Sequence, residues 1–335
     1  MVLETEKTEL RMRDLWETSF LNNDYRQIQN IIEETINDSN PVIRDPLKNL
    51  VSKKGKLLRP MLVVLASRFG SPEQNGALQK IHNIAAAIEI LHLATLVHDD
   101  VIDESPVRRG SPTLHTQVGK KQAILIGDYL FSRCFSLVAE HANLENSKLL
   151  ARAVSSICNS EISQAEDTFS FKTSIRRYNR RIAGKTAALF AISCFVGASE
   201  SGSKKPVCAL FSRIGYNLGM GFQIKDDILD YTGNQKRLGK PIGSDIHDGI
   251  ATLPLIYALQ EDTGKLQTIL HKPPFSEADI QHIIRLVIDN GGVNKAEEQA
   301  SLYTERAYRA IEELPKNEST DLLNTTVDRL LFRLY

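Results

Sequence analysis

Residues 84–103 of the chain have the sequence IAAAIEILHLATLVHDDVID, in which an apolar segment runs directly into three aspartates. The apolar residues follow the spacing of an α-helix. The same period of about 3.6 residues recurs along the chain, for example at Leu150, Val154 and Ile157. Alternating runs typical of strands are scarce. The sequence therefore predicts an all-α protein in which at least one long helix ends in acidic residues.

Turn-forming segments such as Lys272-Pro273-Pro274 and Asn290-Gly291-Gly292 mark the expected ends of helices. Ser276 followed by Asp279 predicts a capped helix start. No fixed-period repeat, low-complexity tract or flexible linker divides the chain. With 335 residues, 42% of them hydrophobic, the chain is long enough for a large buried core. We therefore expect one helical domain spanning residues 1–335, whose motifs lie between about 50 and 260.

The overall charge of the chain is balanced, with 41 basic and 41 acidic residues, so no global field attracts nucleic acid or an anionic membrane. The four cysteines form no C-x-x-C pair, which is typical of reduced thiols in the cytosol. The first 13 residues lack the apolar core of a secretory signal, and the longest nearly apolar run, 186–198, is too short to cross a bilayer. We expect a cytoplasmic protein without a transmembrane segment that binds no nucleic acid.

The spacing D-D-x-x-D occurs twice, each time after an apolar segment with helical spacing. Carboxylates four residues apart share one helix face. Two carboxylates ~6 Å apart repel by roughly 3 kcal/mol at an effective dielectric of about 20, so several of them need cations to stay ionised together. Oxygen ligands on rigid helices suit Mg²⁺ that is shared with substrate phosphates. One copy alone is as compatible with a solvated helix end. Two copies predict that six carboxylates converge on a magnesium–diphosphate site: Asp99, Asp100, Asp103, Asp226, Asp227 and Asp230.

Basic residues follow or precede these clusters. Arg108 and Arg109 come directly after the first cluster, and arginine binds phosphate oxygens in pairs. Lys56 and Arg59 lie at the start of a predicted helix, where backbone N–H groups also favour an anion. These two segments are predicted to form a metal-free diphosphate pocket. Three further residues are predicted to reach the metal-bound diphosphate or to lie at the edge of the site: Lys185, Lys240 and, as a weaker candidate, His82. His92 and His98 are interpreted as hydrogen-bonded helix residues.

Together, these motifs make the chain resemble the trans-prenyltransferase family. Residues 97–103 with 108–110, and residues 221–230, are similar to the two aspartate-rich motifs of that family. Further similar segments occur in the family's order at 55–60, 127–129, 185–186, 238–243 and 252–254. Within the family, the chain is most similar to the catalytic component of heptaprenyl diphosphate synthases.

The resemblance implies an antiparallel helical bundle around a deep central cavity, with the aspartates bridging three Mg²⁺ ions to an allylic diphosphate. Asp99, Asp103, Asp226 and Asp230 are the expected metal ligands, and Asp100, Lys185 and Lys240 are expected to assist catalysis. The allylic site would use Arg108, Lys185, Thr186, Gln223 and Lys240, and the isopentenyl site Lys56, Arg59 and Arg109. A homodimer is expected, and a heterodimer with a small regulatory subunit remains open. The chain departs from the family at Leu57, where arginine is frequent, at Ile250, where lysine is frequent, and at Lys225.

Product length depends on the residues below the first cluster. Ala94 and Thr95 lie roughly one turn, or ~6 Å, before Asp99 and are both small. With no aromatic floor, the growing chain can pass deeper towards Leu91. The sequence therefore predicts a trans-prenyltransferase that makes a medium- or long-chain polyprenyl diphosphate from isopentenyl and allylic diphosphates by ionisation, condensation and elimination. The alternatives are a geranylgeranyl or farnesyl diphosphate synthase and a non-enzymatic helical scaffold or partner subunit. A terpene cyclase is disfavoured because its second motif is of a different, Asn/Ser/Glu type.

Overall fold

The computed structural model of the chain describes residues 15–17, 19–52, 57–71, 77–108, 111–233 and 242–331. These residues form helices almost throughout, with one short hairpin of β1 (Val107–Arg108) and β2 (Ser111–Pro112). The predicted all-α class is confirmed. The helices are α2 (Asn22–Asn37), α3 (Pro41–Ser52), α4 (Leu58–Ser67), α5 (Ala77–Ile102), α6 (Leu114–Val118), α7 (Lys120–His141), α8 (Leu144–Asp167), α9 (Ile175–Ile182), α10 (Ala188–Glu200), α11 (Lys205–Thr232), α13 (Ser244–His247), α14 (Leu253–Gln260), α15 (Lys265–Leu270), α16 (Glu277–Asp289), α17 (Gly292–Glu312) and α18 (Glu318–Leu331).

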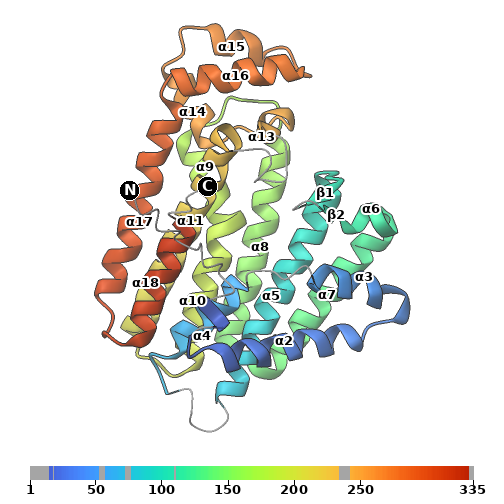
Figure 1. Ribbon diagram of the computed structural model, residues 1–335, viewed down its shortest axis with the longest axis vertical. Coiled ribbons are helices and arrows are strands. Elements are labelled where there is room, and N and C mark those ends of the chain that lie inside the picture. The colour runs from blue at the N-terminus through green and yellow to red at the C-terminus, as the bar shows by residue number, and fades with distance from the viewer. Residues whose placement is uncertain are drawn as a thin grey trace, which may run out of the picture.

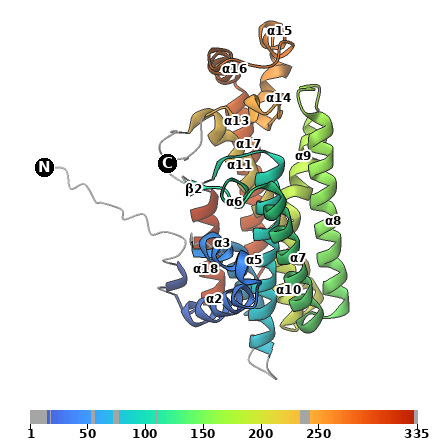
Figure 2. The ribbon, with the colours of Figure 1, turned by 90° about the vertical axis from the view of Figure 1, so that its right-hand side faces the viewer.

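The long helices lie side by side as a bundle, with α15 and α16 across its top (Figure 1). The C-terminal ends of α5 and α11 both lie in the upper half of this view, where β1 and α13 follow them. A single π-helical turn, η1 (Ala183–Ala187), interrupts the otherwise continuous helix formed by α9 and α10. Figure 2 shows α8 and α9 at one side of the bundle, with α18 at the other.

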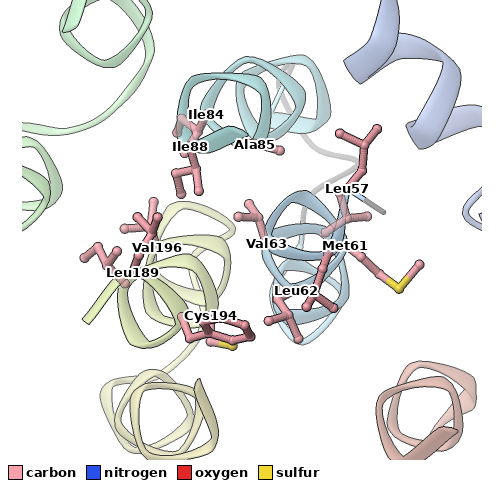
Figure 3. Close-up of a cluster of buried hydrophobic side chains, with 14 of the residues drawn as sticks. Leu57, Met61, Leu62, Val63, Ile84, Ala85, Ile88, Leu189, Cys194 and Val196 are labelled. Atoms are coloured by element: carbon pink, nitrogen blue, oxygen red, sulfur yellow. The ribbon is translucent and has the colours of Figure 1, made fainter. Parts of the chain in front are cut away.

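The interior contains two clusters of buried hydrophobic side chains, and α11 contributes to both. The larger cluster joins α4, α5 and α10, with Met61, Ile88 and Val196 among its side chains (Figure 3). The second cluster surrounds the C-terminal half of α11 together with α14, α16 and α17. Because α11 is anchored in both clusters, its acidic C-terminal end is held in a fixed position relative to α5 and α10.

Glycines allow η1 and α10 to approach α11 at backbone distance. A Cβ added at Gly219 would lie 2.5 Å from the Cα of Ala187, and one added at Gly215 would lie 2.4 Å from the carbonyl oxygen of Phe190. Real side chains do not fit in such gaps. This close packing brings the residues of η1 within hydrogen-bonding distance of α11.

Two helical spans are long and apolar enough to cross a membrane by length and composition, namely 77–102 and 175–200. The first is α5 and the second is α9, η1 and α10 together, which is longer than the apolar run recognised in the sequence. Their most apolar windows are 72% and 67% buried inside the bundle. Such burial is typical of the central helices of a helical core.

Candidate active site

The first acidic cluster forms the C-terminal end of α5, and its three carboxylates face two directions. Asp99 is half-buried and Asp103 is exposed one turn later, where its backbone N–H donates to the carbonyl oxygen of Asp99 at 2.8 Å. Asp100 is only 5% exposed and accepts a hydrogen bond from Nε of Arg108 at 2.5 Å. Asp99 and Asp103 therefore form one face, whereas Asp100 holds Arg108 of β1 in place.

The electrostatics of this face indicate a shortage of positive charge. Burial raises the pKa of Asp99 to about 7; Lys185 lowers it, and Glu161 and Asp103 raise it further. Burial also raises the pKa of Asp103, and Glu161 and Asp248 add to the increase. A cation near the two carboxylates would relieve both penalties. The arrangement is therefore suited to a divalent metal.

The second acidic cluster, at the C-terminal end of α11, presents one of its three carboxylates. Asp226 is exposed. Asp227 is buried and accepts hydrogen bonds from the hydroxyl of Tyr178 at 2.6 Å and from Nε2 of Gln223 at 2.8 Å. Burial raises the pKa of Asp227 to about 6, although these two donors lower it. Asp227 thus orients Gln223.

Asp230 has a different role from the one predicted. Its side chain is fully buried, and its two oxygens accept the backbone N–H groups of Ser244 at 3.3 Å and Asp245 at 2.9 Å. It therefore holds the start of α13. The assignment of Asp230 as a metal ligand is corrected, because both oxygens already have donors.

The prediction that six carboxylates converge is also corrected. Among the residues that the structure describes, three of the six accept no hydrogen bond from a side chain or from a segment outside their own helix: Asp99, Asp103 and Asp226. No three histidine, cysteine or acidic side chains within the described ranges lie close enough to hold a metal ion without other ligands. This geometry fits Mg²⁺, which usually takes one or two carboxylates and completes its shell with water and substrate phosphate.

The π-turn η1 connects the two acidic helix ends. Nζ of Lys185 lies 2.8 Å from Oε1 of Glu161 on α8, and its charge acts on both Asp99 and Asp103. The hydroxyl of the next residue, Thr186, donates to Oε1 of Gln223 on α11 at 2.6 Å. Turns of this kind are frequent at functional sites. The adjacent residues Lys185 and Thr186 therefore link the two helices: the charge of Lys185 acts on the carboxylates of α5, and the hydroxyl of Thr186 bonds to α11.

Sequence reasoning missed two acidic residues of this region. Glu161 follows Ala153 and Ile157 at intervals of four on α8, so an acid occupies a position of the buried helix face. Its side chain is 16% exposed. An acidic residue at an apolar position of a helix is the pattern that could have identified it. Asp248, which follows α13, shows no comparable pattern in the sequence. Only the fold brings its charge close enough to raise the pKa of Asp103.

Arg59 lies in the first turn of α4. Its guanidinium carbon lies 4.8 Å from the centroid of the Phe190 ring on α10, as in a cation–π contact. The Phe190 ring in turn packs against Phe222 of α11, with 5.6 Å between centroids. Three other predicted phosphate-binding residues lie outside the described residues: Lys56, Arg109 and Lys240.

The structure corrects the assignment of His82 to the site. Its side chain is 2% exposed, and Nε2 lies 2.7 Å from Oδ1 of Asp24, which also accepts from Arg68. His82 lies 17 residues before Asp99, or about 25 Å along α5. His92, seven residues before Asp99, shares the face of α5 that carries Asp99. It is therefore the better histidine candidate.

The residues expected to control product length lie on α5 below Asp99. Leu91 and Ala94 are fully buried. Thr95 is half-buried on the same face as Asp99, and its hydroxyl donates to the carbonyl oxygen of His92 at 2.9 Å. Their role in product length stays a prediction.

The chain is similar in sequence and in fold to several known proteins. The sequence profile described as polyprenyl synthetase matches residues 40–287. The chain is 35% identical to heptaprenyl diphosphate synthase component 2 of Geobacillus stearothermophilus, over 91% of this chain and 94% of that protein. It is 36% identical to solanesyl-diphosphate synthase 2 of Oryza sativa, over 94% of this chain and 78% of that protein. The crystal structure of heptaprenyl diphosphate synthase from Staphylococcus aureus is similar with a TM-score of 0.88 at 31% identity, covering 93% of this chain and 98% of that one.

Proposed function

Because the chain belongs to the polyprenyl synthetase family and is a trans-prenyltransferase that makes medium- or long-chain products, we propose that its two acidic helix ends bind the allylic diphosphate through magnesium. The observation that carries this proposal is the π-turn η1. Lys185 acts on Asp99 and Asp103, while Thr186 bonds to the helix that carries Asp226. Members of the family bind diphosphate through divalent metal, and the carboxylate set favours Mg²⁺.

In the proposed complex, Asp99, Asp103 and Asp226 would hold the three expected Mg²⁺ ions together with the diphosphate. The metal supplies positive charge that makes diphosphate a better leaving group. Arg108 is held by Asp100, and Gln223 is held by Asp227, so both are positioned before substrate arrives. Together with Lys185, Thr186 and Lys240, they would hold the allylic diphosphate.

The reaction proceeds in three steps. The C–O bond of the allylic diphosphate breaks, and the diphosphate leaves with the electron pair. The double bond of isopentenyl diphosphate then attacks the allylic cation and forms the new C–C bond. A proton then moves to the released diphosphate from the carbon next to the new cationic centre. Loss of this proton restores a double bond and gives an allylic diphosphate one unit longer. Arg59, with Lys56 and Arg109, would hold isopentenyl diphosphate.

Product length is proposed to depend on the face of α5 below Asp99. Ala94 and Thr95 are small, so the growing chain meets no aromatic ring there and extends towards Leu91. Relatives named as heptaprenyl, solanesyl and nonaprenyl synthases support a product of this class.

We also propose that the chain forms one domain, works in the cytoplasm and pairs with a second subunit. Relatives at 35% and 32% identity are named as component 2 of heptaprenyl diphosphate synthase. Large apolar side chains are exposed on α7 and α8, including Leu125 at 58%, Phe135 at 44% and Ile162 at 59%. Such a surface is typical of an interface. A homodimer is the simpler assembly, and analytical ultracentrifugation of the purified chain alone distinguishes it from a heterodimer that needs a small partner.

The decisive experiment is mass analysis of products from the purified protein. Labelled isopentenyl diphosphate is incubated with each common allylic primer, with Mg²⁺ and with excess EDTA. We expect long-chain polyprenyl diphosphates with Mg²⁺ and none with EDTA. A helical scaffold would release no product under either condition, and product formation that survives EDTA would contradict the metal assignment.

A further inference from the structure

Lys225 of α11 is a cation without a partner among the residues that the structure describes. It directly precedes Asp226 and is half-buried. A lysine that solubilises a helix surface normally extends into water. A partly buried ammonium without a counter-ion is instead suited to an anion that arrives from solution.

The direction of the Lys225 side chain follows from its neighbours on α11. The ring of Phe222 packs on Phe190 of α10, and a Cβ added at Gly221 would lie 3.3 Å from Cδ2 of Leu331 on α18. Around the helix axis, Lys225 lies about 40° from Gly221 and about 60° from Phe222, between the two directions. It therefore faces the space between α10 and α18.

The helix that occupies this sector is α4. It packs against α10, and its Met61 Sδ accepts a hydrogen bond from the hydroxyl of Thr326 on α18. Arg59, in the first turn of α4, stacks on the same Phe190 ring that Phe222 contacts. Lys225 lies about 4.5 Å further along the α11 axis than Phe222. Arg59 and Lys225 thus approach one region from two helices.

Lys225 faces away from the allylic side of the site. Gln223, which bonds to Thr186, lies two residues earlier and therefore about 160° away around the α11 axis. A side chain in this position does not reach the diphosphate held by Thr186 and Lys185. The start of α4 also lacks a cation at Leu57, which is buried at 7% exposure.

We propose that Lys225 is a further ligand of the diphosphate group of isopentenyl diphosphate, opposite Arg59. This inference rests on the proposed function and adds a residue to its second substrate site. A diphosphate bound without metal needs protein cations to balance its charge. The lysine ammonium supplies up to three N–H donors, and the Arg59 guanidinium supplies a planar pair.

The test compares Lys225→Gln, Lys225→Arg and a control, Lys205→Gln, whose lysine is exposed in the first turn of the same helix. Binding of isopentenyl diphosphate is measured by calorimetry in the presence of EDTA, and KM is measured for each substrate with Mg²⁺. Loss of one charged hydrogen-bond donor is expected to weaken isopentenyl diphosphate binding by about tenfold or more in Lys225→Gln. Binding by Lys225→Arg and by the control should stay within about threefold of the parent.

Three results would overturn the proposal. The first is unchanged isopentenyl diphosphate binding in Lys225→Gln. The second is a rise in the KM of the allylic substrate or in the Mg²⁺ requirement instead. The third is equal loss in Lys225→Arg and Lys225→Gln, which indicates a packing role. Product formation by the parent protein is recorded in the same experiment, so failure of the proposed function is recognised separately from failure of this inference.

Discussion

Replacing Tyr178 by phenylalanine tests the buried network that orients the allylic side of the site. The hydroxyl of Tyr178 donates to Asp227, which accepts from Gln223, which accepts from Thr186. The variant keeps the buried ring and removes only one donor to a carboxylate. A hydrogen bond to a charged group contributes about 1.5–3 kcal/mol, and one between neutral groups about 1 kcal/mol.

The effect of this change should depend on pH. The pKa of Asp227 is about 6 in the folded protein, above its ordinary value of 3.8, so its ionisation costs stability as pH rises from about 4 through about 6. Tyr178 is one of the donors that lower this pKa, and its loss raises the pKa further. At pH 8 the carboxylate is ionised, and Tyr178→Phe should lower the free energy of unfolding by about 2 kcal/mol. At pH 5 the loss should shrink to about 1 kcal/mol.

Tyr231→Phe is the matched control. Tyr231 is also buried, but its hydroxyl contacts the neutral hydroxyl of Thr252 at 2.9 Å. Its loss should cost about 1 kcal/mol at both pH values. Urea unfolding of the parent and both variants at pH 5 and pH 8 measures the difference. In addition, kcat/KM for the allylic substrate should fall about tenfold in Tyr178→Phe, because Gln223 and Thr186 lose their fixed orientation. Equal losses in both variants at both pH values would refute the reasoning.

Four further substitutions test individual side chains. Asp99→Ala should reduce the condensation rate at least ~100-fold. It should not lower the free energy of unfolding, because burial already disfavours the charged form of Asp99. A full rate in steady-state assays would show that Asp99 does not belong to the metal site. Ala94→Phe should shorten the products seen by mass spectrometry, and an unchanged product distribution would reject α5 as the wall that the growing chain follows. Asp230→Asn should lower the free energy of unfolding by about 1–3 kcal/mol, because an amide nitrogen cannot accept the N–H of Ser244 or Asp245. Asp226→Asn should instead lower activity without lowering the free energy of unfolding. The opposite pattern in urea unfolding and activity assays would reverse the two assignments.

The features that the sequence predicted well depend on neighbours along the chain. The end of α5 at Ile102 follows the apolar periodicity of residues 84–97. The helix start at Ser276 is confirmed, with the capping box between Ser276 and Asp279. The prenyltransferase function is confirmed through the family, because its motifs are short segments whose spacing survives in the sequence.

The features that the sequence could not predict depend on distant partners. Asp226 and Asp230 have the same chemistry and lie one turn apart, yet Asp230 is used by backbone N–H groups 14 and 15 residues later. His82 is bound by Asp24, 58 residues earlier. The spacing of residues along one helix shows which face of the helix a side chain lies on. It does not show which residues of the folded protein lie opposite that face.

The π-turn between α9 and α10 also has a consequence for insertions and deletions. A π-turn contains one residue more than an α-helical turn needs. Removing one residue from 183–187 would replace this wide turn by an α-helical turn of nearly the same rotation, so α9 and α10 would keep their orientation relative to each other. Tyr178 would then stay beside Asp227, whereas the side chains of Lys185 and Thr186, which lie within the turn, would change direction. A chain one residue shorter at this point should fold around the same bundle and still fail to assemble the diphosphate site.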